Sequence, residues 1–513
     1  MKRKVNRSGG GVNRGNKAGT ASIPAPVGGL NARDAIANMP ETDALTLDNW
    51  FPQPNSVSVR NGYSNWVTGL PGWVETLMHY NGPSSKELFA ASVSGVYDVT
   101  LTGAVGAAVV SGLSNARFQY VNFTTSGGNF LTAVNGVDAP LLYNGSTWTN
   151  PTITGVTAST FVHVNSFKNR LWYVERASTR IWYLPLNSIQ GAATVLDLGP
   201  IFQLGGYLNC MVSWTIDNSA GVDDYAAFIS SEGEVALYRG TDPTYASTWA
   251  LTGTFRIGRP VGRRCYQKYG QDVILITADG VFPISQALTS MEQEQAAISY
   301  KITNLINNDV QAYSSNFGWQ PILYPIGNKL IVNVPQVENT TQYQYVMNTI
   351  TNAWCRFTGW NAACWEIFND SIYFGGSTVV CLADSGSNDN GANINAIGKP
   401  AFSYFGSHEQ KIFTLCRPIF TTNGSLTAAL ALCVDFNDLQ PVNVPVYSGG
   451  SGATWDISPW DTTPWGGANN TVTQWQTVTG VGFSASLKVQ VYAKNISVVW
   501  ASTDYVYESG GAL

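Results

Sequence analysis

The stretch Val273-Ile274-Leu275-Ile276-Thr277-Ala278-Asp279-Gly280-Val281-Phe282-Pro283-Ile284 holds an apolar run, an Asp-Gly pair and a second apolar run. Asp-Gly pairs are typical of tight hairpin turns, because these turns need positive φ angles that glycine adopts without strain. The β-branched and aromatic residues on both sides favour strands. The stretch therefore predicts a β-hairpin.

The same pattern recurs at six other places. The paired runs are 88–90 with 96–97, 130–134 with 141–143, 171–174 with 181–184, 226–229 with 235–238, 330–332 with 343–346, and 372–374 with 379–382. Their turns lie roughly 40 to 60 residues apart, the range expected for four-stranded propeller blades. A sandwich also alternates strands and turns, but it does not easily accommodate this many similar hairpins. The sequence therefore predicts an all-β protein whose main domain is a β-propeller of about six to eight blades.

One segment, residues 290–308, departs from the strand pattern. Ile298, Ile302 and Leu305 recur at helical spacing, and Ser290 with Gln293 resembles a capping box. This predicts a helix inserted between blades. Its apolar stripe is expected to pack on the parent domain, with a subunit contact as the alternative.

After Asp384 the strands become longer. A turn-rich connector at 384–391 precedes alternating runs at 426–434, 487–491 and 496–500. Period-two alternation of this length is typical of a half-buried antiparallel sheet, which predicts a separate β-sandwich-like domain. The expected organisation is a flexible basic arm at 1–25, an extended segment at 26–72, the propeller with its helical insertion at 73–384, and the C-terminal sandwich-like domain at 385–513.

The first residues are rich in glycine and asparagine and carry basic side chains without an acid. Such a segment buries too little apolar surface to order by itself. One interpretation is a solvated tail; the other is an arm that orders against a neighbouring subunit or touches nucleic acid. The candidate contact residues of this arm are Lys2, Arg3, Lys4, Arg7, Arg14 and Lys17.

The composition limits the classes of function. Charged residues make up only 12% of the 513 residues, and the net charge of -5 gives the whole molecule no electrostatic match to a phosphate backbone. The seven cysteines are odd in number and form no CxxC pair, which favours buried thiols over a disulfide framework or a zinc site. The sequence has no apolar run long enough for a transmembrane helix, and glycine-rich residues follow Lys4 where a signal peptide needs an apolar segment.

The sequence also offers few residues for catalysis. None of the three histidines lies in a zinc-binding spacing, and His163, in an apolar run, is expected to be a structural strand residue. Asp223 and Asp224 are expected to be solvated loop acids. Residues 384–391 resemble a calcium loop, but Asn395 stands at the twelfth position where an acid is required, so a turn is the better interpretation. GxSxG and phosphate-loop motifs are missing from the sequence. We therefore expect a non-enzymatic protein with no cofactor, no metal and no catalytic residue.

Three stretches resemble the tail nozzle family of short-tailed bacteriophages, also called packaged-DNA stabilisation proteins or the tail tubular protein B-like family. The first runs from Pro26 through Arg33-Asp34 and Met39-Pro40 to Arg60-Asn61-Gly62-Tyr63. The second contains residues 257–262 and 274–285. The third contains residues 384–394 and the closing 507–511. The resemblance covers the start, middle and end of the chain, although each motif is short.

The resemblance implies a propeller subunit in a hexameric ring of the virion tail, assembled in the bacterial host cytoplasm. Such a ring extends the DNA channel below the portal and head-to-tail adaptor, retains the packaged genome and allows its ejection. Implied partners are further copies of the chain, the adaptor, tail fibres or tailspikes, a tail needle or plug, and genomic DNA passing without sequence-specific binding. An acidic protein suits such a conduit, because phosphates are repelled from it. Two other classes stay open: a propeller that binds glycans or acts as a glycosidase at a cell surface, and a calcium-binding adhesin.

Overall fold

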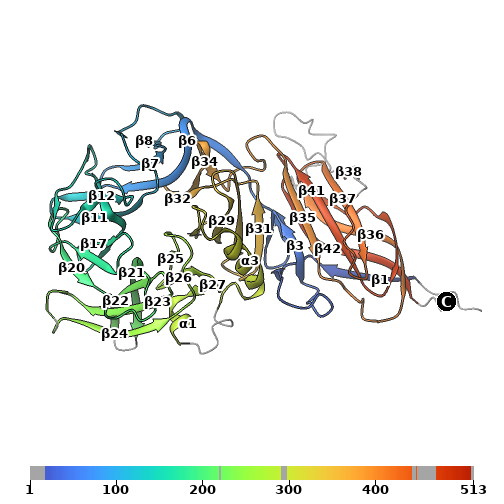
Figure 1. Cartoon of the computed structure of the whole chain (residues 1–513). Helices are drawn as coiled ribbons and strands as arrows, with labels where there is room; N and C mark the ends of the chain where they lie inside the picture. Colours follow the sequence, from blue (N-terminus) through green and yellow to red (C-terminus); the bar gives the residue numbers. More distant parts are fainter. Residues whose placement is uncertain are drawn as a thin grey trace, which may run out of the picture.

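Each predicted hairpin forms the second and third strands of a small antiparallel sheet in the computed structural model. The structure describes residues 18–218, 221–245, 247–289, 297–441, 446–447 and 470–509. Within these residues the sheets form two parts, a ring of blades and a two-sheet sandwich beside it (Figure 1). The predicted fold class, an all-β propeller with a C-terminal sandwich-like domain, is thereby confirmed.

Seven blades can be followed within the described residues. The first and second blades consist of β6 (Tyr63–Asn81), β7 (Lys86–Ser92), β8 (Gly95–Asp98) and β10 (Val110–Ser111), and of β11 (Gln119–Thr125), β12 (Gly128–Val134), β13 (Leu141–Tyr143) and β14 (Trp148–Thr149). The third and fourth consist of β16 (Phe161–Phe167), β17 (Arg170–Glu175), β18 (Arg180–Tyr183) and β20 (Thr194–Asp197), and of β21 (Leu208–Asn218), β22 (Gly221–Ser230), β23 (Glu234–Gly240) and β24 (Trp249–Arg256). The fifth consists of β25 (Tyr266–Tyr269), β26 (Asp272–Thr277) and β27 (Gly280–Pro283), the sixth of β28 (Gln320–Tyr324), β29 (Lys329–Val337), β30 (Thr341–Asn348) and β31 (Trp354–Thr358), and the seventh of β32 (Cys364–Phe368), β33 (Ser371–Gly375) and β34 (Ser377–Ala383). Smaller elements between them are β9 (Gly103–Ala104), β15 (Ile153–Thr154), η1 (Ala158–Thr160) and β19 (Gly191–Ala192).

The long strand β6 closes the ring. Its residues 63–68 and Trp73 pair with β34 of the last blade, and its residues 74–81 pair with β7 of the first blade. Pro71, which cannot donate to a ladder, lies between Thr68 and Trp73, where the pairing with β34 shifts register. Because β6 completes the last blade and also begins the first one, main-chain hydrogen bonds hold the two ends of the ring together.

Large aromatic side chains fill the spaces between blades. Trp172 is 1% exposed and stacks on Trp249 of the next blade at 5.5 Å between ring centroids, with Phe228 at 6.0 Å. Each such ring buries a large apolar area, which is a main source of stability in a protein with few charges. All seven cysteines, in the propeller and in the sandwich, are buried, as the sequence suggested.

The sandwich draws strands from both ends of the chain, which changes the predicted domain limits. Its N-terminal strands are β1 (Ala18–Pro24), β2 (Gly29–Leu30), β3 (Asp43–Asp48), β4 (Trp50–Pro52) and β5 (Val57–Val59). Its C-terminal strands are β35 (Ile394–Pro400), β36 (Lys411–Thr422), β37 (Leu426–Val434), β38 (Val446–Tyr447), β39 (Asn470–Val472), β40 (Gln476–Gly482), β41 (Ala485–Ala493) and β42 (Val498–Ser509). Because β1 pairs with β42 and β3 with β35, residues 18–25 are not part of a flexible arm, and 26–62 is not merely an extended segment. Trp50 and Trp500 meet between the two sheets at 5.7 Å.

One sheet runs from the propeller into the sandwich. Strand β31 of the sixth blade pairs in parallel with β3, and the same ten-stranded sheet continues through β35, β41 and β37. We call this contact, with the ion pairs across it, the joint. Arg356 donates to both carboxylate oxygens of Asp48 at 2.7 Å, and Lys329 donates to Asp384 at 2.8 Å.

Arg60 is the most completely bonded side chain of the joint. Its five N–H donors bond Asn49, the carbonyls of Asn61 and Thr358, and both carboxylate oxygens of Asp389, at 2.6 to 2.8 Å. The Arg60 side chain is fully buried and its guanidinium lies 4.7 Å from the Trp360 ring centroid. It therefore fastens the connector after the propeller to the sixth blade.

The predicted insertion contains a helix, but with other limits. A short helix α1 (Ile284–Thr289) follows β27, and a turn η2 (Tyr300–Ile302) leads into α3 (Thr303–Tyr313). The buried stripe of α3 is Ile306 and Val310, continued from Ile302, and the helix extends to Tyr313, beyond the predicted end at 308. Ser290 and Gln293 lie outside the described residues. Among the helices that the structure describes, none is long and apolar enough to cross a membrane.

Candidate functional site: the axis of the propeller

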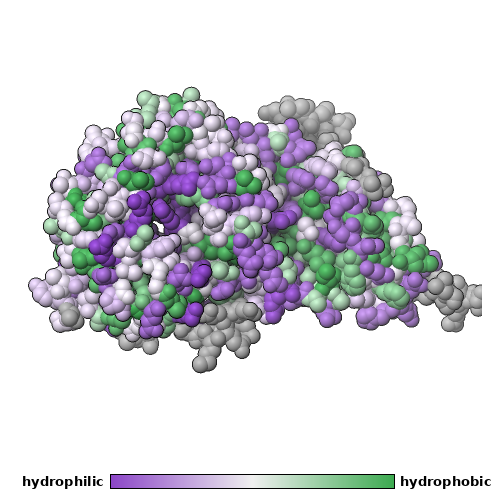
Figure 2. Space-filling view, in the orientation of Figure 1, coloured by the Kyte–Doolittle hydropathy of each residue, from purple (hydrophilic) through white to green (hydrophobic). Residues whose placement is uncertain are grey.

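The first strand of each blade faces the axis of the ring, and side chains from several blades meet there. Figure 2 shows hydrophilic residues gathered around a hollow at the centre of the propeller. A cavity of about 350 Å³ lies where the inner strands end and is lined by His79, Lys86, Glu366 and Asp370 among others. A second cavity of about 240 Å³ shares Glu366 and Gln267 with the first and reaches Arg264. Alternation along each strand places every second inner-strand residue towards this space.

Three side chains from three blades bond one another at the centre. His79 on β6 lies with Nδ1 3.0 Å from Glu366 Oε1 on β32, and the Tyr120 hydroxyl on β11 donates to Glu366 Oε2 at 2.6 Å. The same hydroxyl lies 2.8 Å from His79 Nδ1. These distances fit an imidazole that carries its proton on Nδ1, shared between the carboxylate and the phenol oxygen.

The surroundings set the protonation of this group. Burial lowers the pKa of His79, but the hydrogen bond and charge of Glu366 outweigh burial, so the pKa of His79 lies above its ordinary value. Burial, with the charge of Glu366, raises the pKa of Tyr120 well above its ordinary value. The phenol is therefore a neutral donor, and the carboxylate of Glu366 favours the protonated form of His79.

Arg264 lies beside this group and bonds no carboxylate among the residues that the structure describes. Its Nη2 donates to Thr76 Oγ1 at 2.7 Å and to the carbonyl oxygens of Glu75 and Phe118 at 3.0 Å. Its Nη1 has a single long bond of 3.5 Å to Gln320. Burial lowers the pKa of Arg264, which remains charged because a guanidinium starts so high.

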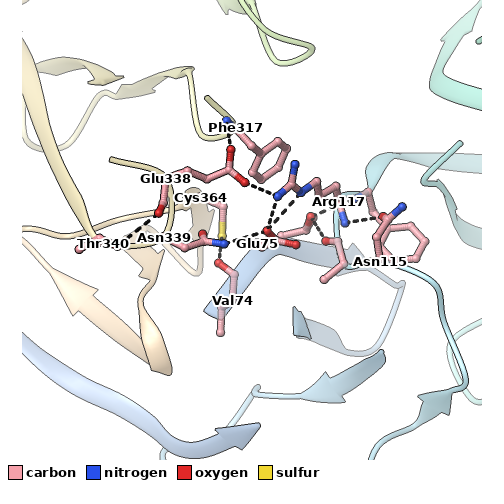
Figure 3. Close-up of polar contacts among 12 residues, drawn as sticks. Val74, Glu75, Asn115, Arg117, Phe317, Glu338, Asn339, Thr340 and Cys364 are labelled. Atoms are coloured by element: carbon pink, nitrogen blue, oxygen red, sulfur yellow. Dashed lines mark hydrogen bonds and ion pairs between the residues drawn. The ribbon is translucent and has the colours of Figure 1, made fainter. Parts of the chain in front are cut away.

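Further arginines lie where the inner strands begin. Arg117 bonds the carboxylates of Glu75 and Glu338, and its guanidinium lies 4.5 Å from the Phe317 ring centroid (Figure 3). The neighbouring pocket, of about 340 Å³, is lined by Arg117, Arg176 and Arg263 together with asparagine and serine residues. We call these three residues the arginine mouth.

The residues singled out from sequence lie elsewhere. Lys2, Arg3, Lys4, Arg7, Arg14 and Lys17 are outside the described residues. His163 is a buried residue of β16, as predicted, and its Nε2 donates to the carbonyl oxygen of Met211 at 3.0 Å. Burial lowers the pKa of His163 to about 4.

Of two predicted loops, the structure places one differently. Asp223 and Asp224 belong to strand β22 rather than a loop, because β22 extends to Gly221 and pairs there with β21. Asp224 forms an ion pair with Lys168 and accepts a bond from Thr215. The connector at 384–391 is a turn whose acids, Asp384 and Asp389, belong to the joint. In the part of the chain that the structure describes, no three His, Cys, Asp or Glu side chains gather as a metal site.

The axial residues were missed because they lack a local motif. His79, Tyr120 and Glu366 are single polar residues within strands, and Arg264 lies just before one. His79 and Glu366, which bond each other, are 287 positions apart. The one available signal was position, since each lies just before a predicted hairpin and therefore on the strand expected to line the axis.

No family model and no curated protein matches this chain. Solved structures do. BBS1N in complex with ARL6DN, soaked with mercury, is 10% identical with a TM-score of 0.40, over 63% of this chain and 97% of that chain. A protein from Bacteroides uniformis, described provisionally as a 6-phosphogluconolactonase, is 13% identical with a TM-score of 0.34, over 63% of this chain and 90% of that one. At these identities and TM-scores the likeness says nothing about activity.

Proposed function

We propose that this protein is a structural subunit of a virion, the tail nozzle of a short-tailed bacteriophage. It acts by assembling into a ring, six-membered as the family resemblance implies, that continues the DNA channel below the portal and adaptor. The ring retains the packaged genome and lets it pass at ejection. No catalytic turnover is part of this role.

The observation that carries the proposal is where the resembling residues lie. In the first stretch, Arg60 bonds Asp389 of the third stretch, and a Cβ on Gly62 would lie 1.6 Å from the carbonyl oxygen of Asn388. Asn31 donates to the buried Asp43 at 2.8 Å, and Lys301 pairs with the same carboxylate. The residues on which the resemblance to the nozzle family rests thus include ones that fix the propeller to the sandwich.

The second stretch supports the same interpretation. Val261 donates to the carbonyl oxygen of Ile276, and Ala278 to that of Arg259. A Cβ on Gly258 would lie 2.5 Å from an Asp279 carboxylate oxygen. These residues connect the fourth blade to the fifth, so the resemblance again concerns architecture. A subunit with one sheet across both domains resists bending, which suits a ring that withstands the pressure of packaged DNA.

The test is assembly. The full chain is purified, and its mass is measured by analytical ultracentrifugation alone and with a purified head-to-tail adaptor ring. We expect a ring, or ring formation on the adaptor, visible by negative-stain electron microscopy. A protein that stays monomeric, ignores the adaptor and binds glycans contradicts the proposal.

A second function has one specific observation in its favour. Glu366 and Asp370 line one cavity with His79, and aromatic Trp365 and Tyr266 line the adjoining one. Carboxylates beside aromatic rings are the components of a carbohydrate site. Binding to a glycan array, or hydrolysis of glycosides that Glu366→Gln abolishes, would favour this alternative. A calcium-binding adhesin would instead lose thermal stability on chelation.

A further inference from the structure

From the side chains of the arginine mouth, we infer that the propeller binds a phosphate group there, as a phosphorylated small molecule or as a backbone phosphate of nucleic acid. This site is independent of the proposed nozzle role. It rests on the charges that line the pocket, the partners that those charges lack, and the hydroxyl and amide groups beside them.

Every charged side chain that lines the pocket is positive. Arg117, Arg176 and Arg263 line it, and the other lining residues are Asn115, Asn135, Gly136, Val137, Gly262, Ser314, Ser315, Asn316 and Phe317. The nearest acids face other groups. Glu75 and Glu338 bond Arg117 from outside the pocket, and Asp138 bonds Ser114 and Asn135.

Two of the arginines are available to a ligand. Among the described residues, the side chains of Arg176 and Arg263 take part in no hydrogen bond or ion pair, and both are exposed. Arg117 is already fixed by two carboxylates, which positions its guanidinium beside Phe317. A guanidinium fork matches the oxygen geometry of phosphate, so two free forks beside a fixed one form a recognition site for this group.

Electrostatics support the same interpretation. Desolvation lowers the pKa of Arg263, and the like charges of Arg117 and Arg176 lower it further. A bound dianion would relieve that repulsion. With Arg264 counted, four arginines stand against Glu75, Glu338 and Asp138, which leaves this end of the axis with one net positive charge in a protein with a net charge of -5.

The backbone keeps the pocket open. Gly136 has φ of +82°, and a Cβ there would lie 2.7 Å from Val162 Cγ1 and 3.7 Å from Arg263 Nη1. Gly262, with φ of +72°, turns the chain immediately before Arg263. The volume of about 340 Å³ exceeds the space that a bare phosphate fills, so the site admits a phosphate with an organic group attached.

The experiment is titration calorimetry of the full chain with inorganic phosphate at constant ionic strength. We expect saturable binding that Arg263→Gln weakens by about tenfold or more, with a similar loss for Arg176→Gln, because each removes a charge-assisted contact. Arg259→Gln is the matched control, because Arg259 is 72% exposed, pairs with Glu232 and lies outside the pocket. The affinity of this variant for phosphate should equal that of the unmodified protein. Circular dichroism and thermal unfolding verify that each variant is folded.

A second arm identifies the source of the phosphate. An oligothymidylate that competes with inorganic phosphate, and loses binding in Arg263→Gln, assigns the site to nucleic acid; phosphate binding without competition assigns it to a phosphorylated small molecule. Absence of saturable phosphate binding, or equal affinity in both pocket variants and the unmodified protein, overturns the inference.

Discussion

The joint and the propeller axis both enclose charged side chains, but they differ in how these charges are paired. At the joint, Arg60 and Arg356 each bond both oxygens of a carboxylate, and Lys329 faces Asp384. At the axis, Arg264 bonds only neutral acceptors, and Arg176 and Arg263 have no partner among the described residues.

The difference separates structure from binding. A buried charge that is fully bonded by its own chain has no capacity left for a ligand, whereas a charge held by neutral groups or left open retains it. The charges of the joint are therefore structural, whereas the charges at the axis retain the capacity to bind a ligand.

The strongest test of this contrast is Arg60→Ala at the joint. The substitution leaves Asp389 buried without its cation, and we expect a loss of about 3–5 kcal/mol in the free energy of unfolding. Urea denaturation measures it, with Arg259→Gln as the exposed control, expected to change stability by about 1 kcal/mol or less. A loss for Arg60→Ala no larger than that of the control would mean that the joint is not held by this ion pair.

His163 and His79, both in the propeller, differ in the direction in which folding shifts their pKa. The pKa of His163 falls from 6.5 to about 4 on folding, so the folded state binds fewer protons than the unfolded state between these values. The stability it contributes is complete above about pH 6.5 and is lost as the pH falls towards about 4, by about 3 kcal/mol in all.

His163→Asn should flatten this acid-side loss, since asparagine does not titrate. Chemical denaturation at a series of pH values tests the expectation, and the exposed His408 provides the matched His408→Asn control. An unchanged pH profile for His163→Asn would show that another group is responsible for acid sensitivity.

The sequence predicted the hairpins because their strands are buried on both faces. Runs such as Val273–Ile276, flanking an Asp-Gly turn, keep a continuous apolar signal that does not depend on distant residues. The inner strands face the axis and mix polar with apolar residues, so His79 and Glu366 could not be brought together from sequence. The sequence also could not show that β1 and β3 belong to the sandwich. Their place depends on pairing with β42 and β35, more than 300 positions away.

The helix shows how a correct periodicity can give the wrong limits. Ile302 belongs both to the predicted stripe and to the observed one, which continues to Ile306 and Val310. A 3.6-residue period can be continued from Ile302 towards the N-terminus or towards the C-terminus. Packing against the sixth blade, which no local pattern encodes, selects the C-terminal direction.

His79 should respond to pH with the opposite sign from His163. Because the carboxylate of Glu366 raises its pKa in the folded state, the stability that His79 contributes is present below its ordinary value of 6.5 and is lost as the pH rises through the folded-state value. His79→Gln should remove this alkaline-side loss, and Glu366→Gln should remove it as well. If His79→Gln instead flattens the acid side, the imidazole is not paired with Glu366 as described.

The smallest expected effect is on the free energy of unfolding of variants in the arginine mouth. It tests directly the contrast between bonded charges at the joint and unbonded charges at the axis. Arg176→Gln and Arg263→Gln remove charges that the described part of the chain does not bond. In phosphate-free buffer the free energy of unfolding should therefore change by about 0.5 kcal/mol or less. Relief of repulsion should make the change more favourable at low salt than at high salt. The measurement is the same urea denaturation applied to Arg60→Ala. A loss of about 2 kcal/mol or more would identify these arginines as structural members, because only a side chain that holds neighbouring groups in place costs that much to remove.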